Sequence, residues 1–338
     1  MKKNQLLVLI LALLSLPATA DEMIMKNGSR LVGTLISAQD GKIVFNTPFA
    51  GDISVTSVNV LEVTTDLPVV LKLKDGVVYK DRQIVVTDEG TSAVAQGKNP
   101  VHFRPGEIAS VNPEPWRLGE GYKWFGAIDT SAVLERGNTD TDEYDATAKS
   151  VWRSLVDRYT LRGMYEVDKT NGDKNKNQWR VRGKYDRFSD QDPDNYIGGQ
   201  LVFFHDEFAD LDLRTTLGPY IGRQFFESGL LTLSGEVGVV YVDEQFDVAD
   251  DNDFYGANWE LDVTSDVIPR LELYAEQVGV VNFDEIDGVL VDTTVGVRFP
   301  LIYGFQTSIE ALFEYDGGAV DDVDELDETY SFKLGYTW

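Results

Sequence analysis

The sequence contains no cysteine and only two histidines among its 338 residues. Without cysteine the chain forms neither disulfides nor thiolate metal sites, and this absence suits an oxidising periplasm, where a free thiol is a liability. His102 has no other metal-ligating residue type beside it, and His205 has no neighbouring serine that it would activate. We therefore expect no catalytic residue, no metal site and no cofactor.

Long apolar runs are also missing beyond Ala20, and none approaches the ~20 residues that a membrane-spanning helix needs. The exception is the start of the chain, where Lys2 and Lys3 precede an apolar segment at 6–16 and Ala18-Thr19-Ala20 ends it with small residues. This order is that of a signal peptide, and we predict export with cleavage after Ala20. Any membrane crossing by the mature chain must then be made by the strands of a closed barrel.

Basic residues are outnumbered, because 30 Lys and Arg stand against 57 Asp and Glu, which gives a net charge of −27. Loss of Lys2 and Lys3 with the leader leaves 28 against 57, a net charge of −29. Phosphate backbones repel so acidic a chain, so we expect no nucleic-acid partner. Low mean hydropathy with many Gly, Tyr and Phe is typical of a barrel whose lipid face uses every second residue.

Residues 21–111 repeat themselves at an offset of 48 residues: Met25-Lys26-Asn27-Gly28 matches Leu73-Lys74-Asp75-Gly76. Asn-Gly and Asp-Gly pairs favour type I′ hairpin turns, so each copy is predicted to be a small all-β unit. The arrangement resembles SH3-like or Sm-like barrels, and two copies packed together are easier to stabilise than one. We expect this domain to be periplasmic. Residues 112–121 contain two prolines and two glycines and are predicted to be a linker.

From Tyr122 to Trp338 the sequence alternates apolar and polar residues in segments separated by turn residues. Their lengths are near the ~9–11 residues of a tilted membrane-spanning strand. An even count returns the chain to the side where it started, as in bacterial outer-membrane barrels. We predict twelve antiparallel strands at about 122–134, 142–153, 157–168, 177–188, 195–205, 211–225, 230–242, 254–264, 270–282, 289–299, 304–315 and 329–338.

The predicted connections alternate in length, which favours a membrane barrel over a secreted sandwich. Short turns are expected in the periplasm and long polar loops outside. The short ones are 154–156, 189–194, 226–229, 265–269 and 300–303, and the long ones are 169–176, 243–253 and 316–328. The long loops at 243–253 and 316–328 contain many carboxylates and no Lys or Arg. Divalent cations prefer carboxylate oxygens, so these loops are candidates for bridging to lipopolysaccharide, although neither has EF-hand spacing.

The final strand is apolar on one face and polar on the other, and the chain stops on an aromatic residue. It resembles the closing strand of bacterial outer-membrane barrels, which the barrel-insertion machinery recognises. The resemblance implies a barrel-assembly signal made of Tyr330, Phe332, Leu334, Tyr336 and Trp338.

Ser131 and the element Gly137-Asn138-Thr139-Asp140-Thr141 occur in the first predicted hairpin. From about Tyr122 to Trp338 the sequence resembles the uncharacterised family of salt-induced outer-membrane proteins. The resemblance implies a barrel and a link to salt or osmotic response, and it implies no established activity.

Side chains at alternate positions of a strand point to opposite faces, and we call each such set of positions a parity. Charges on the polar parity of a strand must face the lumen, since on the lipid face each would cost about 2–4 kcal/mol at the membrane centre. The second to sixth strands then present a basic wall: Lys149, Arg153, Arg158, Arg162, Arg180, Arg182, Lys184 and Arg214. The seventh to eleventh present an acidic wall: Glu236, Glu260, Asp262, Glu272, Glu276, Asp292, Glu310 and Glu314. Either the walls pair and plug the lumen, or water remains and the field orients polar solutes. The fifth strand has consecutive apolar residues at 202–204, and its register stays open.

The sequence therefore predicts an all-β outer-membrane protein with a periplasmic domain, acting as a structural or narrow pore-forming component of the Gram-negative envelope. The alternative is a binding protein whose periplasmic repeats recruit a protein or cell-wall partner. An outer-membrane lipid hydrolase is the third and least favoured hypothesis.

Overall fold

The computed structural model describes residues 20–39, 41–87, 90–95, 98–104, 107–135, 140–227, 231–268, 271–285, 288–318 and 324–338. The chain divides into two compact units between Glu114 and Pro115. Within the described ranges, no helix has both the length and the apolar character needed to cross a membrane. Most of the predicted signal peptide, at 1–19, and the Gly137-Asn138-Thr139 element lie outside the described residues.

In its described part, the first unit is a ten-stranded sheet made of two sets of five strands. The first set is β1 (Asp21–Met25), β2 (Arg30–Gln39), β3 (Lys42–Thr47), β4 (Gly51–Thr56) and β5 (Val60–Thr64). The second is β6 (Val69–Leu73), β7 (Val78–Thr87), β8 (Gly90–Ala95), β9 (Lys98–His102) and β10 (Ile108–Val111). β1 starts at Asp21 and β6 at Val69, 48 residues later. β10 of the second set pairs with β2 of the first.

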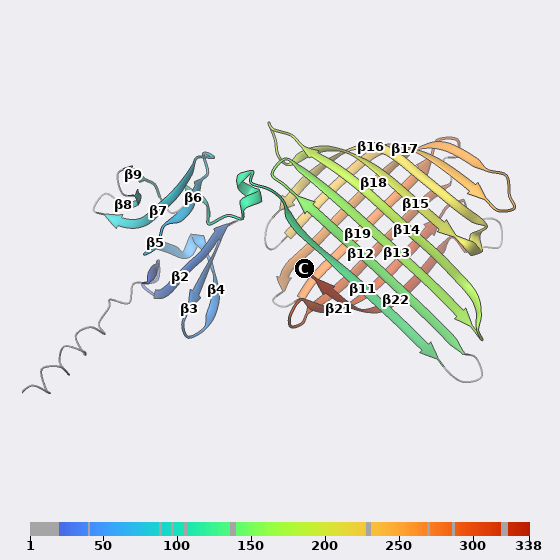
Figure 1. Ribbon diagram of the computed structural model, residues 1–338, viewed down its shortest axis with the longest axis horizontal. Helices are drawn as coiled ribbons and strands as arrows, with labels where there is room; N and C mark the ends of the chain where they lie inside the picture. Colours follow the sequence, from blue (N-terminus) through green and yellow to red (C-terminus); the bar gives the residue numbers. More distant parts are fainter. Residues whose placement is uncertain are drawn as a thin grey trace, which may run out of the picture. The chain divides into compact units, whose positions relative to one another are not determined.

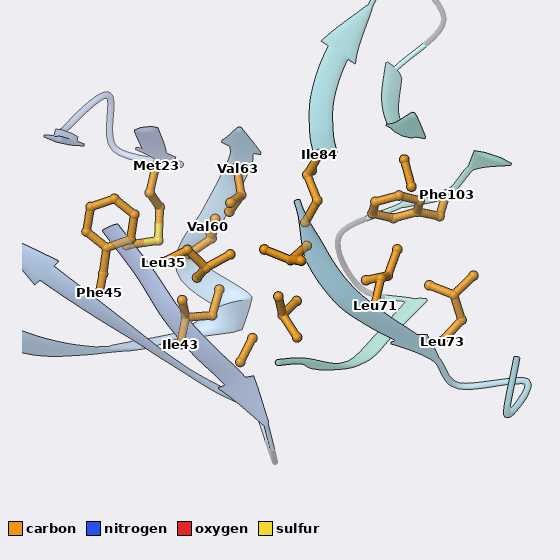
Figure 2. Packing of buried hydrophobic residues seen from close by; sticks show 14 residues of the cluster. Met23, Leu35, Ile43, Phe45, Val60, Val63, Leu71, Leu73, Ile84 and Phe103 are labelled. Atoms are coloured by element: carbon orange, nitrogen blue, oxygen red, sulfur yellow. The ribbon is translucent and has the colours of Figure 1, made fainter. Parts of the chain in front are cut away.

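The two sets share one hydrophobic core. Figure 2 shows Met23 and Phe45 from the first set and Leu71 and Ile84 from the second, all with no exposed side-chain surface. A second main-chain link joins the sets, because the Thr65 amide donates to the carbonyl oxygen of Ile84 at 2.8 Å. A set of only about 45 residues buries little apolar surface alone, so the shared core stabilises the two copies as one unit.

The hairpin turns at Asn27-Gly28 and Asp75-Gly76 are not type I′. Gly28 and Gly76 have positive φ angles of 85° and 88°, whereas Asn27 and Asp75 do not. The Gly28 amide donates to the carbonyl oxygen of Met25 at 2.9 Å, and Gly76 repeats this bond with Leu73. Each turn is therefore a three-residue loop that ends on a left-handed glycine, so the predicted turn type was wrong.

The second unit is a closed antiparallel barrel of twelve strands in the described chain, as the sequence predicted (Figure 1). A short 3₁₀ turn, η3 (Pro115–Leu118), precedes it. The strands are β11 (Lys123–Glu135), β12 (Thr141–Arg153), β13 (Asp157–Thr170), β14 (Asp173–Phe188), β15 (Asn195–Asp206), β16 (Leu211–Glu227), β17 (Leu231–Phe246), β18 (Asn252–Ile268), β19 (Leu271–Asn282), β20 (Val289–Pro300), β21 (Phe305–Asp316) and β22 (Leu326–Thr337). A 3₁₀ turn, η4 (Glu207–Ala209), joins β15 to β16.

Several barrel strands continue further toward the predicted long loops than the alternation of apolar and polar residues indicated. The expected loop at 169–176 is instead a tight hairpin, because Asn171 and Gly172 both have positive φ (52° and 88°), the geometry of a type I′ turn. The expected loop at 243–253 shrinks to 247–251, since β17 runs to Phe246 and β18 starts at Asn252. Beyond the bilayer both faces of a strand meet water, so the apolar alternation stops while the pairing continues.

The fifth strand of the barrel, β15, now has a defined register. Ile197 and Leu201 are exposed on the outer wall, whereas Tyr196 and Gln200 are buried inside. Phe204 shares the inner parity and lies under the guanidinium groups of Arg180 and Arg214, at 4.7 and 5.7 Å from its ring centre.

The barrel closes between its first and last strands. Among the described residues, the ladder joins Ala127–Thr130 of β11 to Leu334–Thr337 of β22. Trp338 and Gly126 then exchange both main-chain hydrogen bonds, at 3.1 and 3.2 Å. A Cβ atom at Gly126 would lie 2.5 Å from the Trp338 ring, so this close approach requires glycine. The outward face of β22 carries Tyr330, Phe332, Leu334, Tyr336 and Trp338, which are 39% to 70% exposed.

We expect that deleting Trp338 weakens the seam, because it removes two main-chain hydrogen bonds and the aromatic contact with Trp124 at 5.8 Å. These losses lower the free energy of unfolding by roughly 2–4 kcal/mol. Urea unfolding of the barrel in lipid vesicles measures the change, with deletion of the exposed loop residue Asp250 as the control. Equal stability of the two deletion variants would show that the seam does not depend on Trp338.

Candidate functional site

The interior of the barrel holds most of its paired charges. β13 and β14 supply most of the cations, with Arg158, Arg162, Arg180, Arg182 and Lys184 on their inner faces. β17 and β18 supply the central carboxylates Glu236 and Glu260. These side chains are long enough to leave their own strand and meet partners elsewhere on the wall.

Three ion pairs in the described part of the chain join strands that lie six places apart in the twelve-strand order and are therefore diametrically opposite. Arg162 on β13 pairs with Glu276 on β19. Arg180 on β14 lies 2.9 Å from Asp292 on β20. Lys149 on β12 lies 3.9 Å from Asp262 on β18. The lumen is therefore bridged from wall to wall.

A compact cluster surrounds Glu260. Its carboxylate pairs with Arg182 and lies 2.8 Å from the Lys184 ammonium and 3.9 Å from Arg162. Lys184 also donates to Glu236 at 2.5 Å, and both side chains are only 6% exposed. The Arg182 guanidinium makes a further bond of 3.0 Å to the Gln200 side chain. Because these charges are buried, each depends on its partners for the solvation that water would otherwise supply.

An aromatic layer fills the lumen beside this cluster. Phe188, Tyr196 and Tyr220 pack together, and the Tyr196 hydroxyl donates to Glu236 at 2.9 Å. Tyr220 donates to Asp186, a fully buried carboxylate that also accepts from Arg158 at 2.6 Å. The tyrosine rings fit because they lie over glycines: a Cβ atom at Gly198 would meet the Tyr220 ring at 2.4 Å, and one at Gly222 would meet Tyr196 at 2.3 Å.

Cations also cap this aromatic layer. The Arg153 guanidinium lies 3.5 Å from the centre of the Phe188 ring and 5.6 Å from that of Trp116, in η3. Trp116 is buried, so η3 packs against the end of the barrel strands.

Of the sixteen charges that the sequence placed on the two walls, nine are joined in one network: Lys149, Arg158, Arg162, Arg182, Lys184, Glu236, Glu260, Asp262 and Glu276. Others pair outside this network. Arg180 pairs with Asp292, Arg214 with Glu244 on the adjacent strand at 2.6 Å, and Glu310 with Lys333 on its neighbouring strand at 2.5 Å. Glu244, which the sequence placed in an outer loop, is buried.

Sequence reasoning missed several members of the lumen. Asp186 lies on the basic wall and Arg298 on the acidic wall, where Arg298 pairs with Glu272. Glu166 is another acid among the cations and accepts from Lys176 at 2.7 Å. All three have the inner parity of their strands, so parity alone would have found them. They were missed because only cations were assigned to one wall and only acids to the other.

The two histidines have structural partners. The His205 ring stacks on Trp179 on the outer wall, and its Nδ1 lies 2.8 Å from the carbonyl oxygen of Asp212. His102 lies 2.8 Å from the Ser92 hydroxyl across the strand pair β8–β9. Among the described residues, no group of three or more His, Cys, Asp or Glu side chains is arranged to hold a metal ion.

A closed antiparallel barrel with an apolar outer wall and a charged interior is a β-barrel of the outer-membrane class. Residues 128–338 match the family described as a protein of unknown function, DUF481, and the chain belongs to that family. This match confirms the predicted resemblance to an uncharacterised barrel family, while the link to salt stays a prediction. No curated protein matches the chain.

Solved structures with similar folds include outer-membrane porins and channels. One is the NanC porin, with 10% identity, a TM-score of 0.39, and coverage of 64% of this chain and 98% of that chain. Another is the outer-membrane channel DcaP of Acinetobacter baumannii, with 10% identity, a TM-score of 0.33, and 94% coverage of each chain. A third is the CymD monoaromatic hydrocarbon channel, with 9% identity, a TM-score of 0.30, and coverage of 66% and 89%. Similarity at this level says nothing about the function of this chain.

We expect Glu260→Gln to destabilise the barrel by about 3–5 kcal/mol, because it removes the negative charge that the buried Arg182 and Lys184 share. The measurement is urea unfolding in lipid vesicles. The control is Glu207→Gln, which changes an exposed carboxylate 3.5 Å from Lys174 and should have little effect. Wild-type stability of Glu260→Gln would contradict a buried network.

Proposed function

We propose that this protein is an integral outer-membrane barrel that is closed to solutes at rest and acts as a structural component of the envelope. The observation that carries the proposal is the set of ion pairs between opposite strands, such as Arg162–Glu276. Barrels of about 8 strands are filled by side chains and those of about 16–18 strands leave a water channel, so strand number alone does not decide for twelve. Here the paired side chains reach across.

The outer wall supports the membrane location. Large apolar side chains are exposed all round the barrel, for example Ile128, Leu217, Val239 and Ile309. In water such a surface would be costly, whereas lipid chains solvate it. We propose that the signal peptide exports the chain, that the barrel-insertion machinery reads the last strand, and that both chain ends and the short turns lie in the periplasm.

Partners follow from the same orientation. The first unit would lie in the periplasm, where recruitment of a protein or cell-wall partner is the alternative function. On the outer side, Asp247, Asp250 and Asp251 form an exposed acidic loop, which we propose meets lipopolysaccharide through divalent cations.

A second candidate function is a narrow pore that opens as salt rises, and the less buried pairs favour it. The Lys149–Asp262 side chains are 44% and 25% exposed, and those of Arg180–Asp292 are 37% and 32% exposed. Within the described residues, Nε of Arg162 and of Arg182 are buried without a hydrogen-bond partner. Buried polar atoms need partners, so these two nitrogens favour some water in the lumen. Salt shortens the screening length to about 3 Å at 1 M, which weakens such pairs.

We expect the wild-type barrel in planar bilayers to show no steady conductance at about 0.1 M salt, where the screening length is still about 10 Å. Arg162→Gln/Arg182→Gln should conduct and prefer cations, because the carboxylates that those arginines neutralise remain. Arg214→Gln, whose partner lies on the adjacent strand, is the matched control and should stay closed. A wild-type barrel that conducts steadily would refute the closed state.

The salt-opened pore makes a separate prediction. If screening separates the pairs, wild-type conductance should rise more steeply than the bulk conductivity as salt increases from about 0.1 M to 1 M. Arg180→Gln/Asp292→Asn should remove part of that excess, because it deletes the exposed pair. If the barrel shows no conductance up to 1 M salt, the salt-opened pore is excluded and the structural role is the one that stands.

A further inference from the structure

The lipid-facing wall carries a groove of about 1010 Å³ at the short-turn end of β14–β18. Most of its lining residues have the outer parity of their strands and therefore face the membrane. Its size is at the upper end of the roughly 300–1,000 Å³ typical of small-ligand sites.

The groove follows two adjacent rows of cross-strand neighbours. The first row runs across five strands: Arg187, Ile197, Ile221, Val237 and Trp259. The second row is shorter and consists of Arg223, Gly235 and Leu261. Each row begins with an arginine and continues with apolar residues. The groove thus has a cationic end and an apolar end.

Gly235 creates the depth of the second row. A Cβ atom there would come within 3.2 Å of both Leu261 and Phe225, so any side chain at this position would enter the groove. Trp259 closes the far end, where its indole nitrogen donates to Gln277 at 3.2 Å. Four strand spacings of about 4.8 Å give the first row a length of roughly 19 Å.

The polar end has the charges of a phospholipid headgroup site. Arg187 is exposed, and no ion-pair partner of it is found in the part of the chain that the structure describes. Arg223 is held in place by Asp192 at 3.1 Å, by Asp194 at 4.0 Å and by the Asn195 side chain at 2.6 Å. Asp190 also lines this end. An outward arginine is costly at the membrane centre and costs little near the interface, so both arginines belong at headgroup level.

We propose that this groove binds one zwitterionic phospholipid, with its phosphate at Arg187 and Arg223, its amine at Asp190 and an acyl chain over Gly235. Guanidinium groups bind phosphate oxygens through charge-assisted hydrogen bonds, and the carboxylate complements the ammonium group. The inference rests on the proposed orientation, which places this end in the phospholipid leaflet on the periplasmic side.

A second groove on the outer wall provides the comparison. It measures about 570 Å³ and lies over Gly183 and Gly199, between Leu161 and Leu217. Its one charged lining residue, Lys184, points into the lumen, where it pairs with Glu236 and Glu260. This second groove has an apolar floor without a headgroup site, so lipid there should exchange freely.

Native mass spectrometry of the full-length protein in mild detergent tests the proposal, with phosphatidylethanolamine, phosphatidylglycerol and lipid A as probes. We expect the wild type to retain one phosphatidylethanolamine. Gly235→Leu fills the part of the groove assigned to the acyl chain, and Arg187→Gln/Arg223→Gln removes the phosphate contacts, so each variant should lower the bound fraction roughly tenfold. Gly183→Leu fills the second groove and should bind as the wild type does. Heat-induced mobility shifts in gels verify that each variant is folded.

Equal retention by Gly235→Leu and Gly183→Leu would overturn the inference, and so would a wild type without bound lipid. Preference for lipid A would overturn it too, together with the proposed orientation. Conductance recorded on the same samples separates this inference from the proposed function. A closed barrel without lipid refutes only the groove, and a conducting barrel with bound lipid refutes only the closed state.

Discussion

The structure depends on charges that are buried inside the barrel and must be paired there. Arg162, Arg182 and Lys184 leave the β13–β14 wall and end on carboxylates of β17, β18 and β19. Bringing such groups out of water costs several kcal/mol per ion, and only opposite charges with further hydrogen bonds offset that cost. The tyrosine hydroxyls on Glu236 and Asp186 provide those bonds. The interior therefore favours an arrangement in which these charges are paired, and we propose that this arrangement also closes the lumen.

The outer wall imposes the complementary constraint. Lipid solvates one face of every strand, so apolar residues must occupy every second position for the width of the membrane. This explains why alternation in the sequence was enough to predict twelve strands and a closed barrel. It also explains where that prediction failed. Beyond the membrane the constraint ends, and the hairpin at Asn171-Gly172 continues strands that the pattern had ended.

The partner in each ion pair was harder to predict than the side of the barrel wall on which a charged residue lies. The partner depends on the register of pairing across several strands, whereas the side depends only on alternation within one strand. Arg214 has the inner parity that the sequence indicated, yet it pairs with Glu244 on the next strand. The pairing with Glu244 was not predicted, because the sequence analysis placed Glu244 in a loop. The exceptions to the two-wall pattern, Asp186 and Arg298, show that the interior is a network in which most cations have a carboxylate nearby. Parity identifies lumen residues, and only the fold shows which of them meet.

A double-mutant cycle between Arg162 and Glu276 tests the central claim most directly, since these residues lie on opposite strands and far apart in sequence. The unfolding free energies of the wild type, Arg162→Gln, Glu276→Gln and the double variant would be measured in lipid vesicles. If the pair bridges the lumen, the two changes should be non-additive by roughly 0.5–3 kcal/mol. Additivity within about 0.3–0.5 kcal/mol would contradict the account, because residues that do not touch behave independently.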